Sequence, residues 1–158
     1  MSEIITPDQA GLDQHVVEVN EKTFGHLLSG RAIFTLESKA TGTRFTYKVT
    51  KKEEDGKPPL YFVGLLSGPN NSQDYRYLAF VGAEESLPRL TARSCAGEDA
   101  ASYKAIRWAF HMLGQEKVEE FSEQVNVWHE GRCFRCSRRL TVPESIQTGL
   151  GPVCAEMI

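Results

Sequence analysis

The sequence contains few cysteines, no long apolar run and no excess of basic charge. Of 158 residues, four are cysteine. The longest apolar stretch, LYFVGLLSG at 60–68, is far shorter than the roughly 20 residues that cross a bilayer. The first residues are polar and lack the apolar segment of a signal peptide. We therefore expect a cytoplasmic protein that does not enter the membrane and whose thiols stay reduced.

Catalytic signatures are also missing. The chain has no G-x-S-x-G, no Walker loop and no G-x-G-x-x-G after a strand. His129 and Glu130 are adjacent, so the H-x-E signature of zinc deaminases is absent as well. We therefore expect that the protein is not an enzyme. The formal net charge of −3 means that any nucleic-acid contact would need a local basic patch.

The middle of the chain has the pattern of an antiparallel sheet. Phe45, Tyr47 and Val49 alternate with polar residues, which is typical of a half-buried strand. Short turns separate several such segments, which predicts a meander. The expected strands are RAIFTLES (31–38), TRFTYKVT (43–50), YFVGLLSG (61–68) and YRYLAFVGA (75–83), with RLTARS (89–94) as a possible fifth.

A helical period follows the strands. Tyr103, Ile106, Phe110 and Leu113 share one stripe of a helix at 102–114. Residues 115–128 predict a second helix that turns into an extended segment. The fold class is therefore α+β, a small antiparallel sheet or barrel packed by a helix. We expect a peripheral arm (1–24), an α+β domain (25–126) and a C-terminal module (127–158).

The C-terminal module has the spacing of a metal site. His129, Cys133, Cys136 and Cys154 follow the pattern H-x3-C-x2-C-x17-C. A C-x2-C turn brings two thiolates to one ion, and a third thiolate with one imidazole completes a tetrahedral shell. Soft thiolates favour zinc. Pro152 can start a short helix, and we expect Cys154 in its first turn. The module is then similar to a reduced treble-clef finger with a structural Zn²⁺.

Other interpretations of the thiols stay open at this stage. Glu130, Glu144 or a water molecule can replace His129 as the fourth ligand. A redox pair is an alternative for C-x-x-C, although no βαβ pattern surrounds it. Cys95 stands among turn residues, and we expect it to be a free thiol.

The module also resembles a known group of sequences. The shared positions are Cys133, Cys136, Leu140, Pro143, Ser145, Ile146, Gly149, Gly151, Pro152 and Cys154. They match an uncharacterised zinc-finger-like family common in bacteriophage and actinobacterial proteins, in which glycine is usual at positions 134 and 137. The strand block is similar to the N-terminal part of phage proteins with this ending. The resemblance implies a small phage-encoded zinc protein that acts in the host cytoplasm.

Two groups of side chains are candidate binding surfaces. Arginines surround the cysteine pair, next to an aromatic ring, which suits phosphate contact and base stacking. A second group lies at helical spacing with a tryptophan at its edge. The residues are Arg132, Phe134, Arg135, Arg138 and Arg139 in the first group, and Lys104, Arg107, Trp108 and His111 in the second. For both groups, an ordinary solvated surface is the alternative.

A third basic surface is the polar face of the strand at 43–50, where Arg44 and Lys48 continue into Lys51 and Lys52. Two functions fit these patterns. The first is an accessory protein that contacts nucleic acid or nucleoprotein complexes through the arginine-rich knuckle, the turn from Arg132 to Arg139 that holds the cysteine pair. The second is a protein-directed inhibitor or modulator of a bacterial host or anti-phage defence complex.

Overall fold

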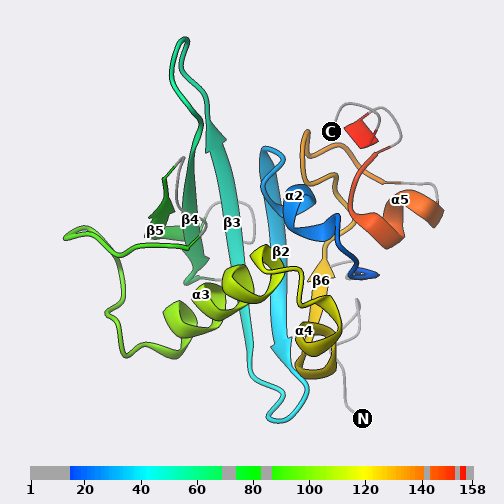
Figure 1. The fold of residues 1–158 in the computed structure, drawn as a ribbon, viewed down its shortest axis with the longest axis horizontal. Helices are drawn as coiled ribbons and strands as arrows, with labels where there is room; N and C mark the ends of the chain where they lie inside the picture. Colours follow the sequence, from blue (N-terminus) through cyan, green and yellow to red (C-terminus); the bar gives the residue numbers. More distant parts are fainter. Residues whose placement is uncertain (1–14, 69–73, 83–86, 141–142, 152–153, 156–158) are drawn as a thin grey trace.

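The sheet is six-stranded, antiparallel and open. The computed structural model describes residues 15–68, 74–82, 87–140, 143–151 and 154–155. The strand order is β1-β6-β2-β3-β4-β5, and Figure 1 shows β5 and β6 far apart across the sheet. The strands are β1 (His15–Val16), β2 (Arg31–Ser38), β3 (Arg44–Lys52), β4 (Leu60–Leu66), β5 (Tyr75–Val81) and β6 (Val125–His129). Of the two predicted architectures, sheet and barrel, the structure has the sheet.

Strands β2 to β5 form the predicted meander. Each is hydrogen-bonded to the next in an antiparallel register, with Phe34 opposite Tyr47 and Val49 opposite Val63. All four side chains are almost fully buried, so the alternation in the sequence identifies the core face correctly. The possible fifth strand at 89–94 is wrong, because Arg89 makes only an isolated bridge to Phe80.

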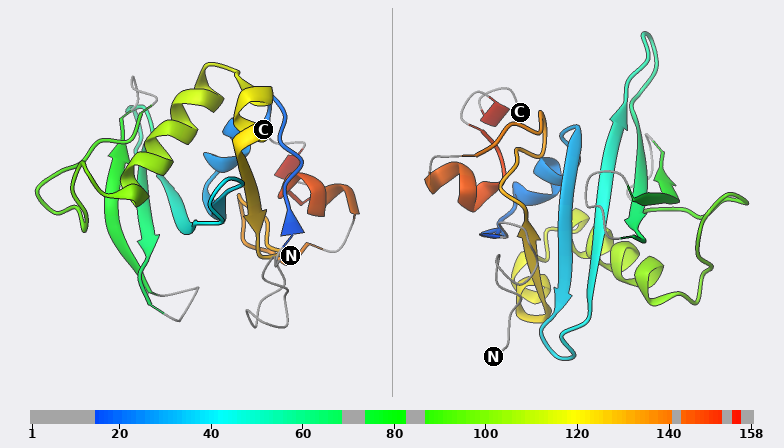
Figure 2. Two further views of the ribbon diagram at one scale, coloured as in Figure 1. Left: turned by 90° about the horizontal axis from the view of Figure 1, so that it is seen from below. Right: turned by 180° about the vertical axis from the view of Figure 1, so that it is seen from behind.

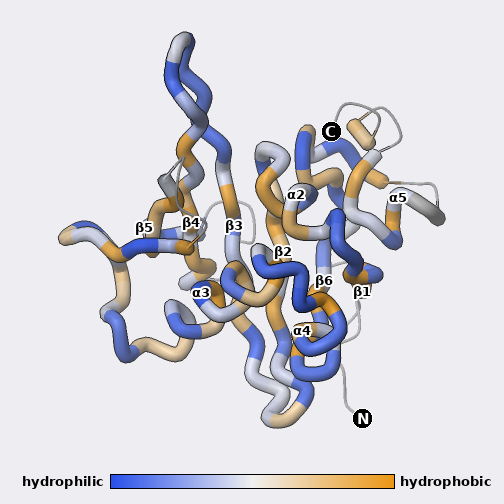
Figure 3. The backbone as a smooth tube through the Cα atoms, viewed as in Figure 1, coloured by the Kyte–Doolittle hydropathy of each residue, from blue (hydrophilic) through white to orange (hydrophobic). Residues whose placement is uncertain are grey.

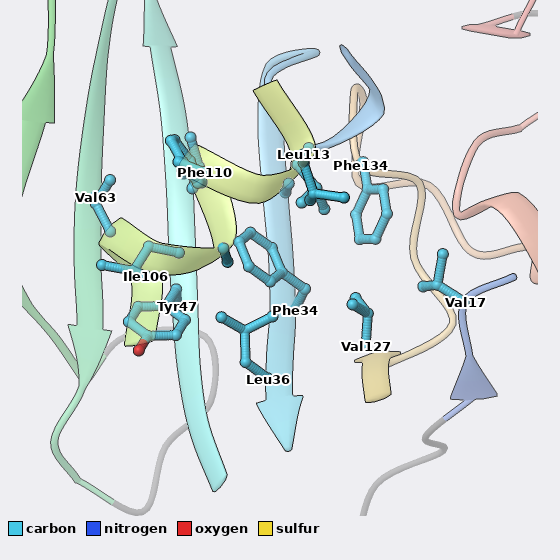
Figure 4. Close-up of a cluster of buried hydrophobic side chains, with 14 of the residues drawn as sticks. Val17, Phe34, Leu36, Tyr47, Val63, Ile106, Phe110, Leu113, Val127 and Phe134 are labelled. Atoms are coloured by element: carbon cyan, nitrogen blue, oxygen red, sulfur yellow. The ribbon is translucent and has the colours of Figure 1, made fainter. Parts of the chain in front are cut away.

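Helix α3 (Ala101–Gly114) covers the core face of the sheet, as the helical stripe predicts. Ile106 and Phe110 are fully buried, and Figure 4 shows both in one cluster with Phe34 and Tyr47. The hydroxyl of Tyr47 donates a hydrogen bond to the carbonyl of Ser102 at 2.6 Å. Burial raises the pKa of this phenol, so it stays protonated and anchors the helix to the centre of the sheet.

The second predicted helix is short and ends in a strand. Helix α4 (Val118–Gln124) leads directly into β6, which lies between β1 and β2 with Leu36 opposite Val127. The predicted boundary between the domain and the C-terminal module therefore falls inside a strand of the sheet. Residues 1–14 of the predicted arm lie outside the described residues.

Two short helices stand beside this edge of the sheet. Helix α2 (Thr23–Leu27) precedes β2, and α5 (Pro143–Thr148) lies within the C-terminal module. Figures 1 and 2 show both on the β6 side of the molecule. Apolar residues run along the strands, while the tip between β3 and β4 is hydrophilic (Figure 3). Among the described residues, none of the helices has the length and apolar character needed to span a bilayer.

Candidate metal centre

The first two cysteines lie in a tight backbone turn. The amide of Cys133 donates to the carbonyl of Arg138 at 2.8 Å, and the amide of Ser137 donates to Cys133 at 2.9 Å. A third bond joins Leu140 to Gly131 at 2.7 Å. Ser137 has a φ of 65°, a left-handed conformation that glycine adopts more easily.

Backbone amides point at the sulfur of Cys133. The amide nitrogens of Arg135 and Gly151 each lie 3.4 Å from this sulfur. Burial alone raises the pKa of the Cys133 thiol, but amides from Gly151, Cys136 and Arg135 outweigh it and hold the pKa below its ordinary value. The turn is therefore arranged to stabilise a thiolate, which is the form that binds metal.

Cys154 completes a cluster of three sulfurs. Its sulfur and those of Cys133 and Cys136 all lie within 4.8 Å of one another. Tetrahedral zinc with Zn–S bonds of about 2.3 Å needs sulfurs about 3.8 Å apart, a separation that lies within this 4.8 Å limit. Cys133 and Cys154 are buried, whereas Cys136 is half-buried. The cluster can hold a metal ion, and its donor set is consistent with zinc.

The electrostatics of Cys154 differ from those of Cys133. Burial raises the pKa of the Cys154 thiol, and the neighbouring cysteines raise it further. The guanidinium of Arg135 opposes this effect by donating a hydrogen bond to the sulfur at 3.5 Å. Three thiols this close cannot all ionise without a compensating positive charge, which a divalent metal supplies.

Phe134 is buried, which corrects the prediction that its ring is available for base stacking. Its side chain is 0% exposed and packs edge-on against Phe34 and His129. The backbone on either side is tied down: the amide of Phe134 donates to Gly149 at 2.7 Å, and its carbonyl accepts from Arg31 at 2.7 Å. Phe134 therefore joins the module to the sheet and has no ring face available for base stacking.

His129 lies outside the cluster of sulfurs. The side chain is 2% exposed, and its Nδ1 accepts a hydrogen bond from the amide of Gly131 at 2.9 Å. Nε2 therefore carries the proton and donates it to the carbonyl of Ile146, 2.5 Å away. With both ring nitrogens occupied, the imidazole connects β6 to the turn and to α5. Within the described part of the chain, no fourth histidine, cysteine or carboxylate joins the three cysteines.

The other arginines of the knuckle point outward. Arg132, Arg138 and Arg139 are exposed, and a backbone bridge pairs Arg132 with Arg139 across the hairpin. The guanidinium of Arg132 also donates to the carbonyl of Ser137 at 3.2 Å. Three cations therefore stand on one short and hydrogen-bonded hairpin. Arg135 differs from them, because it turns inward to Cys154.

The helical group and the free cysteine lie elsewhere. Lys104, Arg107 and His111 are exposed on α3 and, with Trp108, line a cavity of about 690 Å³. Trp108 stacks on Phe121, with ring centroids 5.5 Å apart, so most of this ring serves the contact between α3 and α4. Cys95 is exposed and stands apart from the cluster.

A set of residues near the metal centre was missed by sequence reasoning. Arg31, Lys51 and Tyr61 line a cavity together with Arg135 and Cys136. Lys51 was expected on the polar face with Arg44 and Lys48, but the alternation of β3 puts it on the opposite side, paired with Tyr61. The strand period gives the face of Lys51, but no local signal connects it to a cysteine module more than eighty residues later.

The comparisons with known proteins give a family match for the C-terminal part of the chain. No curated protein and no solved structure matches the chain. Residues 128–158, which hold the three cysteines and the turn between them, match the model of a family of unknown function, DUF6011.

Proposed function

We propose that the cysteine cluster binds one structural zinc ion. The observation that supports this most directly is the convergence of Cys133, Cys136 and Cys154 within 4.8 Å, with two backbone amides directed at one sulfur. A knuckle followed by a ligand at the start of a short helix has the layout of a small treble-clef finger. A residue outside the cluster or a water molecule supplies the fourth ligand.

We further propose that the protein is an accessory factor that contacts nucleic acid through this knuckle. Three exposed arginines on a hydrogen-bonded hairpin suit phosphate groups, because each guanidinium presents a planar set of donors that matches phosphate oxygens. Since Phe134 is buried, base stacking there is excluded from the proposal. The contact is therefore with the backbone, largely independent of base sequence and strongly dependent on salt.

The similarity of the module to phage and actinobacterial sequences supports a bacterial or phage setting. In that setting, we infer a small protein that acts on nucleic acid or nucleoprotein in the host cytoplasm. The role of the metal is to hold the arginine-bearing hairpin in shape. No step of chemistry is assigned to the metal, because the role proposed for it is structural.

A second function is favoured by the cavity beside α3. Leu87, Pro88 and Leu90 line it together with the basic residues of the helix. A mixed apolar and basic groove suits an acidic segment of another protein. On this alternative, the chain is a modulator of a bacterial host or defence complex, and α3 is its contact surface.

Matched charge reversals separate the two functions. One variant carries Arg138→Glu and Arg139→Glu on the hairpin, and the other carries Lys104→Glu and Arg107→Glu on α3. Both change the net charge equally. The zinc-loaded variants are titrated with a fluorescent single-stranded oligonucleotide at several salt concentrations, and tagged forms are recovered from bacterial lysate with and without nuclease.

If the knuckle contacts nucleic acid, only the hairpin variant loses affinity. Its plot of log affinity against log salt becomes shallower by about 1.4, because each phosphate contact on a single strand contributes about 0.7. Equal losses of affinity in both variants would show that binding reflects the net charge of the protein and not a contact made by the hairpin. A protein that stays bound after nuclease, and is lost only in the α3 variant, supports the alternative.

A further inference from the structure

A polar cavity of about 870 Å³ adjoins the cysteine cluster. We call it the knuckle cavity. Its walls come from α2 and the turn into β2, from the end of β3, from the start of β4, and from Arg135 and Cys136 of the knuckle. Its volume lies within the range of about 300–1,000 Å³ that is usual for small-molecule sites. Segments that are distant in the sequence therefore form one concave surface beside the metal centre.

Backbone hydrogen bonds hold these walls together. The amide of Arg31 donates to the carbonyl of Phe134 at 2.7 Å, and the amide of Lys51 donates to the carbonyl of Gly30 at 2.9 Å. A Cβ on Gly30 would lie 2.9 Å from the carbonyl oxygen of Arg135. The close approach of the β2 turn to the knuckle therefore depends on glycine, and it fixes the distance between the two walls.

The charged side chains of the knuckle cavity are mostly cationic. Arg31, Lys51 and Arg135 line it, against one carboxylate, Glu53. The Lys51 ammonium lies 2.9 Å from Glu53, whose side chain is 69% exposed. Hydrogen bonding and charge attraction from Lys51 hold the pKa of Glu53 below its usual value. An ion pair this exposed contributes little stability, so Lys51 can exchange Glu53 for a more highly charged anion.

Arg135 links the knuckle cavity to the metal centre. It lies between two of the clustered cysteines in the sequence and donates a hydrogen bond to the third, Cys154, at 3.5 Å. A metal bound by the three sulfurs would fix both the backbone of Arg135 and the far end of its side chain. The position of one cation in the cavity is therefore set by the cluster.

We propose that the knuckle cavity binds a phosphate group carried by a nucleotide or by a nucleic-acid strand. Guanidinium and ammonium groups that line one concave surface are the usual partners of phosphate oxygens. Tyr61, half-buried at the same surface, offers a ring to the attached sugar or base. This inference rests on the proposed function, because the bound zinc holds Arg135 in place.

A matched pair of lysine variants provides the test. Lys51 and Lys52 are neighbours on β3 whose side chains project from opposite faces, and Lys52 pairs with Glu54 away from the cavity. Zinc-loaded full-length chains carrying Lys51→Gln or Lys52→Gln are titrated calorimetrically with inorganic phosphate, adenosine monophosphate and a 5′-phosphorylated single-stranded oligonucleotide. Equal zinc content and equal unfolding midpoints establish that both variants are folded.

We expect Lys51→Gln to weaken phosphate binding by about tenfold, which is the usual effect of losing one hydrogen bond to a charged group. Lys52→Gln should change it by less than about twofold, as a surface charge outside the site does. Glu53→Gln should tighten binding, since it removes the competing carboxylate. The inference is overturned if the two lysine variants bind equally, or if Lys51→Gln and Arg31→Gln both bind like the unmodified chain.

The outcomes separate this inference from the proposed function. Phosphate binding that depends on Lys51, without any binding of the oligonucleotide, supports the cavity and contradicts the nucleic-acid role. Oligonucleotide binding that depends on Arg138 and Arg139 but not on Lys51 or Arg31 supports the nucleic-acid role and contradicts phosphate binding in the cavity. A nucleotide is the source of the phosphate if adenosine monophosphate binds more tightly than inorganic phosphate and the oligonucleotide binds no more tightly than adenosine monophosphate.

Discussion

Phe134 and Gly149 join the two halves of the C-terminal module. The amide of Phe134 donates a hydrogen bond to the carbonyl of Gly149 at 2.7 Å. A Cβ on Gly149 would lie 2.3 Å from the Phe134 ring, and the φ of Gly149 is +85°. The backbone conformation and the packing therefore both require glycine at this position.

Gly149→Ala should destabilise the zinc-loaded protein by roughly 2–5 kcal/mol, since a left-handed alanine costs about 1–2 kcal/mol and overpacking about 1–3 kcal/mol. Gly42→Ala is the matched control, because Gly42 has a φ of +76° and nothing within 4 Å of its Cβ position. Gly42→Ala should lower the free energy of unfolding only by the cost of a left-handed alanine, about 1–2 kcal/mol. Urea unfolding measures both, and equal losses would show that the Phe134 ring moves aside freely.

Cys136→Ser should lower zinc affinity by more than about 100-fold, beyond the loss seen when a residue supporting a metal ligand is removed. Cys95→Ser should leave it unchanged, because Cys95 is exposed and stands apart from the cluster. Competition with a chromophoric chelator measures the affinity of each variant. Retention of full affinity by Cys136→Ser would contradict the assignment of this thiol as a ligand.

His129→Gln tests the role of the imidazole. Both of its nitrogens are engaged, with Gly131 and with Ile146, so we expect the variant to keep one zinc per chain while unfolding at lower urea concentration. Native mass spectrometry gives the zinc content. Loss of zinc at a urea concentration where the sheet is intact would restore His129 as the fourth ligand.

The same variant should reveal a dependence of stability on pH. Burial lowers the pKa of His129 from 6.5, the carbonyl of Ile146 opposes this effect, and His15 lowers the pKa further. The folded state therefore favours the neutral ring, so the stability it contributes is present above pH 6.5 and is lost as the pH falls through the lower folded-state value.

The measurement is the difference in unfolding free energy between the unmodified chain and His129→Gln at pH 7.5 and at pH 5. Zinc release in acid affects both proteins alike, so it cancels in the difference. The difference should be larger at pH 7.5. A difference that does not change with pH would show that the neutral ring is not what stabilises the fold.

Local patterns in the sequence predict much of this structure. The period of two around Tyr47 and Val49 identifies the core face of β3, and the stripe through Ile106 and Phe110 identifies the buried face of α3. Each signal arises within a few residues, because each element must bury one side against the same core. The C-x2-C spacing brings Cys133 and Cys136 together in the same way, whereas Cys154 joins them from eighteen residues further along the chain.

The features that the sequence did not predict depend mostly on contacts between residues that are far apart in the chain. Phe134 stands among arginines, which suggests exposure, but its environment is made by Phe34 and Gly149. Helix α2 was not predicted, because a helix of five residues is too short to show a helical period. The knuckle cavity draws on residues as far apart as Arg31 and Cys136, and no local pattern connects them.

The position of β6 has a consequence for how the chain is made. On a ribosome, β2 to β5 emerge long before β6, whose His129 lies opposite Phe34. Until then, one edge of β2 lacks its neighbour, and an open edge invites pairing with other chains. The cysteines follow β6 immediately. The strand that covers this edge of β2 therefore leaves the ribosome shortly before the cysteines, which can fasten it with a metal.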